Sequence, residues 1–113
     1  MVYVLLLINI SLLVTGQVLW KIAVTNIEEW NLSTAVSLAL SPYFIGGALL
    51  YVAATALWLV ILSKLPLSIA YPSQSISYIF GAIIAYFIFK ETITATQWAG
   101  MAVIIFGVYL IAK

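Results

Sequence analysis

Residues 65–89 read LPLSIAYPSQSISYIFGAIIAYFIF, a stretch that is apolar enough to cross a bilayer and yet polar along its first half. A helix of about 20 mostly apolar residues spans the hydrocarbon core of a membrane. The polar side chains of this stretch are Ser68, Tyr71, Ser73, Gln74, Ser75, Ser77 and Tyr78. Lipid gives such groups no hydrogen-bond partner, so we expect them to face protein, ligand or water. The stretch predicts a membrane helix whose polar face lines a substrate path.

The composition of the whole chain is that of a membrane protein. Of its 113 residues, 66% are hydrophobic and 6% are charged. Soluble domains average about 45–50% apolar and about 25% charged residues. The length suffices for four spanning helices of roughly 20 residues each and for little else. The sequence therefore predicts an all-α membrane protein with four transmembrane helices.

Four apolar runs set the expected transmembrane spans, at residues 2–24, 43–63, 67–89 and 95–112. The longest connection contains a further short helix, expected over residues 31–41, with Asn31 as its cap and Pro42 as its stop. We expect this segment to lie on the membrane surface, and an ordered linker without function is the alternative. Two lysines fall on each side of the membrane, so the lysine bias that normally sets orientation is absent.

Several residue types that support catalysis or metal binding are missing. The chain has no cysteine, which excludes disulfides, thiolate metal sites and cysteine nucleophiles. It also has no histidine, the commonest general base and metal ligand. No nucleotide-binding motif is present, and a net charge of +1 gives no indication of nucleic-acid binding. We therefore expect a protein that is not an enzyme and that uses neither a cofactor nor a metal.

Uncharged polar residues inside the expected spans are the candidate substrate contacts. An amide within a span needs a partner, and Gln17 and Gln74 could simply bond to each other. Each serine could bond a carbonyl of its own helix, and Lys21 could be an interfacial lysine instead of a phosphate ligand. Tyr51 and Trp58 could line a cavity, although helix packing or lipid contact is the favoured interpretation. The residues predicted to bind substrate are Asn9, Gln17, Trp20, Lys21, Tyr71, Ser73, Gln74, Ser77 and Tyr78.

Gly100 and Gly107 lie on one face of the last expected span, since seven residues make nearly two helical turns. Together with Glu91, with LPLSIAYP at residues 65–72 and with GQVLWK at residues 16–21, these glycines resemble the drug/metabolite transporter superfamily, which includes the EamA-like transporters and the small multidrug resistance family. The resemblance implies a dimer of four-span chains. It also implies that Gly100 and Gly107 form the contact between the fourth helices of the two chains.

A narrower resemblance involves residues 14–17 (VTGQ), 57–62 (LWLVIL) and 69–72 (IAYP), together with the long first connection. These features look like the aminoarabinose-phosphoundecaprenol flippase subunits. The resemblance implies a bacterial inner-membrane transporter that flips a polyprenyl-phosphate-linked sugar of the undecaprenyl type, or a related anionic glycolipid. It further implies contact with membrane lipids and pairing of two chains, either as an antiparallel homodimer or as a heterodimer with a paralogous four-span subunit.

One position departs from the proton-coupled exporters of the small multidrug resistance family. Those proteins carry a glutamate three residues before the glycine of the first span, and here that position is Leu13. Exchange of protons for a cation needs an ionisable group at membrane depth, whereas Glu28, Glu29 and Glu91 all fall in connections. A drug–proton antiporter is therefore disfavoured. Two alternatives stay open: a small-molecule or quaternary-cation exporter without that glutamate, and a non-transporting accessory subunit.

Overall fold

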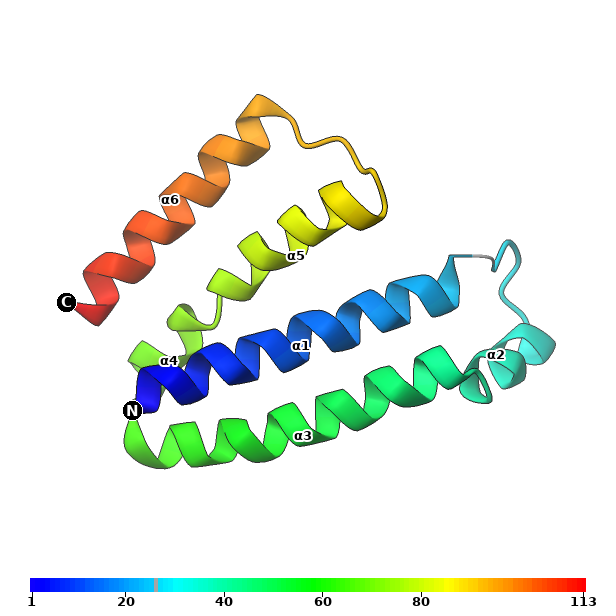
Figure 1. The fold of residues 1–113 in the computed structure, drawn as a ribbon, viewed down its shortest axis with the longest axis horizontal. Helices are drawn as coiled ribbons and strands as arrows, with labels where there is room; N and C mark the ends of the chain where they lie inside the picture. Colours follow the sequence, from blue (N-terminus) through cyan, green and yellow to red (C-terminus); the bar gives the residue numbers. More distant parts are fainter. Residues whose placement is uncertain (26) are drawn as a thin grey trace.

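The structure is a computed structural model that describes residues 1–25 and 27–113, and the regular elements of this part are all helices. They are α1 (Val2–Val24), α2 (Leu32–Ala39), α3 (Pro42–Lys64), α4 (Leu67–Ser73), α5 (Ile76–Ile88) and α6 (Ala95–Ala112). The chain runs back and forth, so that its two ends lie at the same end of the molecule (Figure 1). The expectation of an all-α fold is confirmed.

Three of the described helices, α1, α3 and α6, are long and apolar enough to cross a membrane. Large apolar side chains such as Leu49, Val103 and Phe106 are exposed on their surfaces, as expected for helices that face lipid or another chain. The fourth expected span, at residues 67–89, differs from the prediction because it is divided into α4 and α5. Neither of these two helices is long enough to cross a membrane alone.

A proline and two turn residues cause the break between α4 and α5. Pro72 lies inside α4 and has no N–H to donate to the preceding turn. After it, the backbone hydrogen bonds begin to join residues three positions apart. Gln74 N–H is shared between the carbonyls of Ala70 and Tyr71, each at 3.1 Å, and Ser75 N–H donates to the Pro72 carbonyl at 3.0 Å. The Ser75 hydroxyl also donates to the Pro72 carbonyl. The break therefore has its own hydrogen bonds, and α5 restarts at Ile76.

Helices α1 and α3 pack side by side along their length (Figure 1). Gly16 and Gly47 face each other between the two helices, and a Cβ atom added to Gly47 would lie 2.9 Å from the Gly16 carbonyl oxygen. The same added atom would lie 2.6 Å from the Trp20 ring, whose Nε1 donates to the Phe44 carbonyl at 3.1 Å. Small residues thus let the two backbones approach closely, as in other membrane helix pairs.

A small apolar core joins three helices. Leu6, Ile10 and Val14 of α1 pack with Ile61 of α3 and Ala70 of α4. Helix α6 stands beside α4 and α5 and buries only a narrow strip of its surface. The core therefore positions α1, α3 and α4 relative to one another, while most of α6 is left uncovered.

The connections at the end opposite the termini carry the acidic residues. Glu28 and Glu29 lie between α1 and α2, and Glu91 lies between α5 and α6 (Figure 1). In the first connection, the Asn31 side chain accepts from the Thr34 N–H at 3.0 Å, and the Thr34 hydroxyl accepts from the Asn31 N–H at 2.9 Å. This reciprocal cap begins α2. Its position on the membrane surface stays a prediction.

Candidate functional site

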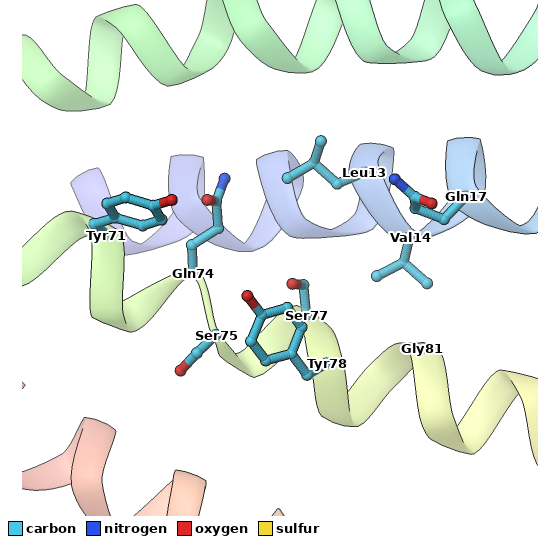
Figure 2. Close-up of a pocket in the computed structure, with 9 residues that line it drawn as sticks. All are labelled: Leu13, Val14, Gln17, Tyr71, Gln74, Ser75, Ser77, Tyr78 and Gly81. Atoms are coloured by element: carbon cyan, nitrogen blue, oxygen red, sulfur yellow. The ribbon is translucent and has the colours of Figure 1, made fainter.

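A cleft of about 470 Å³ lies between α1 and the broken pair α4–α5 (Figure 2). We call it the first cleft. Its walls are Leu13, Val14 and Gln17 from α1, and Tyr71, Gln74, Ser75, Ser77, Tyr78 and Gly81 from the segment around the break. The break supplies part of its polarity, because Gln74 and Ser75 are the two residues between α4 and α5.

A second cleft of about 400 Å³ lies among α1, α3 and α4. Its walls are Asn9, Leu13, Tyr51, Ala54, Thr55, Trp58, Leu67, Tyr71 and Gln74. Leu13, Tyr71 and Gln74 line both clefts, so the two adjoin along these residues. A third, shallower cleft of about 680 Å³ continues from Tyr71 over Pro72 to Tyr78.

A chain of hydrogen bonds ties the three walls together. Asn9 is completely buried, and its Nδ2 donates to the Ala54 carbonyl of α3 at 2.7 Å. Its Oδ1 accepts from Gln74 Nε2 at 3.0 Å. Figure 2 shows the Gln74 amide directed toward α1. The side-chain partner of Gln74 is therefore Asn9 and not Gln17, the alternative that the sequence left open.

The clefts are electrically neutral. None of the described residues that line the three clefts is charged. Leu13, an apolar residue, lines both the first and the second cleft. The walls therefore offer amides, hydroxyls and aromatic rings, and they place no carboxylate beside a bound molecule.

The structure brings together most of the residues predicted to bind substrate. Gln17, Tyr71, Gln74, Ser77 and Tyr78 line the first cleft, and Asn9, Tyr71 and Gln74 line the second.

The other predicted residues lie outside the three clefts. Trp20 packs against α3, where its ring stacks on Phe44 with centroids 6.1 Å apart. Lys21 is exposed one turn beyond Gln17, near the end of α1. Ser73 is buried, and its hydroxyl has no hydrogen-bond partner among the described residues. Gly100 and Gly107, predicted for the dimer contact, lie on α6 with nothing within 4 Å of an added Cβ atom.

Sequence reasoning gave too little weight to the face of α3 that lines the second cleft. Tyr51 packs on Trp20 with ring centroids 5.8 Å apart and Trp58 packs against the core, as favoured from the sequence, and both also line that cleft together with Thr55. Their positions are four and then three residues apart, which places them on one helical face. That spacing was the signal that could have assigned them to a common surface.

Comparisons with known proteins agree with this architecture. The EamA-like transporter family matches residues 1–113. The probable 4-amino-4-deoxy-L-arabinose-phosphoundecaprenol flippase subunit ArnE of Proteus mirabilis (strain HI4320) is 38% identical over 112 residues, which cover 99% of this chain and 97% of that protein. The subunit of the same name from Hamiltonella defensa subsp. Acyrthosiphon pisum (strain 5AT) is 37% identical over 112 residues, which cover 98% of this chain and 96% of that protein.

A third relative of that name, from Pseudomonas fluorescens (strain Pf0-1), is 35% identical over 114 aligned positions, which cover 96% of this chain and 95% of that one. No solved structure matches the chain. The resemblance seen in the sequence is thus confirmed over nearly the whole length. Together with the three long apolar helices, these matches identify an integral, multi-pass membrane protein with a transport role. The chain belongs to the EamA-like transporter family.

Proposed function

We propose that this chain is one subunit of a dimeric flippase that moves a polyprenyl-phosphate-linked sugar across the bacterial inner membrane. The observation that carries the proposal is the pair of adjoining clefts, which offer neutral hydrogen-bonding groups and aromatic rings without a charged side chain. The name of the relatives, which specifies a 4-amino-4-deoxy-L-arabinose linked to phosphoundecaprenol, supports a sugar-phosphate lipid as the substrate.

The clefts suit a head group that must leave water while its chain stays in lipid. Amides and hydroxyls can replace the hydration of the sugar and the phosphate, since buried polar groups need hydrogen-bond partners. The walls hold no carboxylate to repel the phosphate. Leu13, Gln17 and Lys21 are four residues apart on α1, so Lys21 lies on the same face, one turn beyond the first cleft. We propose that the phosphate enters the first cleft from this end.

We also propose that α4 and α5 together make the fourth crossing of the membrane. Three crossings would leave the two termini on opposite sides, whereas Figure 1 places them at the same end. Transporters often line their substrate paths with helices that are interrupted at membrane depth, where the unwound backbone faces a cavity. The break at Gln74 and Ser75 borders the first cleft, which agrees with such a role.

Native mass spectrometry of the purified protein tests the substrate. The wild-type protein should retain 4-amino-4-deoxy-L-arabinose-phosphoundecaprenol, and Lys21→Met should weaken its binding about tenfold, since hydrogen bonds to charged groups contribute about 1.5–3 kcal/mol. Lys113→Met, which removes a lysine from the far end of the chain, is the matched control and should have little effect.

Two outcomes would contradict these assignments. Equal losses of lipid binding in Lys21→Met and Lys113→Met would show that Lys21 does not bind the phosphate. A wild-type protein that retains a quaternary cation and never the lipid would support the cation exporter instead.

The dimer is tested at the open face of α6. Changing both Gly100 and Gly107 to leucine should convert the dimer to a monomer in detergent, because the bulk would block the approach of a second helix. An added Cβ atom meets nothing of the same chain within 4 Å at either position, so the fold of the single chain should survive. Light scattering on the eluted protein gives the mass. Ala102→Leu, on another face of α6, should leave the dimer intact, and a dimer that persists in the double variant would place the contact elsewhere.

A further inference from the structure

Gln74 is one of the three residues, with Leu13 and Tyr71, at the boundary between the first cleft and the second. Figure 2 shows its amide directed from the break between α4 and α5 toward α1, where it bonds to Asn9. The bond from Gln74 Nε2 to Asn9 Oδ1, 3.0 Å long, links residues 65 positions apart. In the described part of the chain, it is the hydrogen bond between side chains that joins α1 to the break between α4 and α5. The bond therefore lies at the boundary between the two clefts.

The two partners differ in freedom. Asn9 is fully buried inside α1, and its orientation is fixed by the bond from its Nδ2 to the Ala54 carbonyl. Gln74 is only partly buried and lies between two helices, after Pro72 and among bonds that span three residues. Residues at the ends of helices are the usual positions of hinges. If the bond breaks, Gln74 is therefore the partner that moves.

We infer that the hydrogen bond between Asn9 and Gln74 is a gate between the two clefts, which the head group of the substrate opens by replacing Asn9 as the acceptor for Gln74 Nε2. The inference rests on the proposed function, because it requires a head group that enters these clefts. A phosphate oxygen is a stronger acceptor than an amide oxygen, since hydrogen bonds to charged groups are roughly twice as strong as neutral ones. The head group thus binds the open state more tightly than the closed state, and its binding shifts the protein toward the open state.

Asn9 stays in place when the gate opens, and its Oδ1 becomes available to a sugar hydroxyl. The aromatic rings of Tyr51 and Trp58 and the hydroxyl of Thr55 border the space beyond. The gate thereby couples the arrival of a phosphate in the first cleft to the admission of the sugar into the second.

Fluorine NMR can observe the gate directly. The chain has four tryptophans, and Trp58 lines the second cleft, so 5-fluorotryptophan places a probe there. Its resonance is assigned by its loss in Trp58→Phe. In lipid nanodiscs, adding 4-amino-4-deoxy-L-arabinose-phosphoundecaprenol to the wild-type protein should move this resonance to a second position. Gln74→Leu should hold it at or near that second position without the lipid.

Two further variants sharpen the test. Gln74→Asn keeps an amide but is one methylene shorter, so it should behave like Gln74→Leu. Gln17→Leu makes the matched change on the other wall of the first cleft and should leave the lipid-free Trp58 resonance at the wild-type position. If Gln74→Leu and the wild-type protein share one lipid-free resonance, the gate is overturned.

The gate and the proposed function fail in different ways. A wild-type protein that retains the lipid in mass spectrometry while its Trp58 resonance never moves would overturn the gate and leave the function standing. If Gln74→Leu moves the Trp58 resonance but the wild-type protein binds no lipid, the bond between Asn9 and Gln74 does close the second cleft. In that case the lipid head group is not what opens it.

Discussion

Replacing Gly47 with alanine should destabilise the protein strongly, whereas the same change at the neighbouring Gly46 should not. A methyl group at Gly47 would lie 2.6 Å from the Trp20 ring and 2.9 Å from the Gly16 carbonyl oxygen. Relief requires α1 and α3 to separate, because the second obstacle is backbone. Overpacking of this kind costs typically about 1–3 kcal/mol. A parting of the two helices would also weaken the bond from Trp20 Nε1 to the Phe44 carbonyl.

Gly46 is the matched control on the same helix. A methyl group there would meet only Leu19 Cδ1, at 3.3 Å, and that atom is the end of a flexible side chain. Both substitutions gain about 1 kcal/mol of helix propensity, so Gly46→Ala should be neutral or stabilising. Unfolding of the two variants in detergent micelles, followed by circular dichroism, gives the comparison. Equal stabilities would show that α1 and α3 do not cross at Gly16 and Gly47.

Replacing Leu13 with glutamate should abolish binding of the phosphate-linked sugar. Leu13 lines both the first and the second cleft, so the new carboxylate would stand beside the head group. Two like charges about 5 Å apart repel by about 3 kcal/mol at an effective dielectric constant of about 20. A loss of that size lowers affinity more than about 100-fold. Lipid retention in native mass spectrometry, at alkaline pH where the carboxylate is charged, measures the change.

Leu13→Gln separates charge from shape. Glutamine has nearly the size of glutamate and adds hydrogen-bonding groups to a wall that already carries Gln17 and Gln74. We expect this variant to bind the lipid within a few-fold of the wild-type protein. If the glutamate variant binds as well as the glutamine variant, the phosphate does not lie in the clefts that Leu13 lines.

The helical fold could be predicted because a bilayer restricts the choice of structure. Long apolar runs can satisfy their backbone groups in lipid only as helices or closed barrels. The break after Pro72 could not be predicted with the same ease, since membrane helices often tolerate a proline. What ends α4 is the local preference of Gln74 and Ser75 for short-range bonds, and the Ser75 hydroxyl competes for the Pro72 carbonyl.

Part of the lining of the two clefts could be predicted as a set of residues but not as an arrangement, and a substrate role for these residues stays a prediction. Periodicity places Gln17 on one face of α1 and Ser77 on the polar half of the stretch that follows, yet it does not say which faces meet. Trp20 illustrates the limit: it shares a face with Gln17 in the sequence pattern, and the space that Gly47 leaves draws it to α3. The pairing of Asn9 with Gln74 likewise depends on how α1 meets the break.

The neutrality of the clefts has an electrical consequence. Every described lysine and glutamate lies in the last turn of a helix, in a connection or at the end of the chain. The membrane potential acts on charge that moves through it, with about 2.3 kcal/mol per elementary charge per 100 mV. If the chain flips a lipid as proposed, the described residues contribute no moving charge at membrane depth, and we expect the voltage to act on the cargo. An amino sugar on a phosphodiester is a zwitterion that crosses without electrical work, whereas the same lipid without its amine would carry one negative charge through the field.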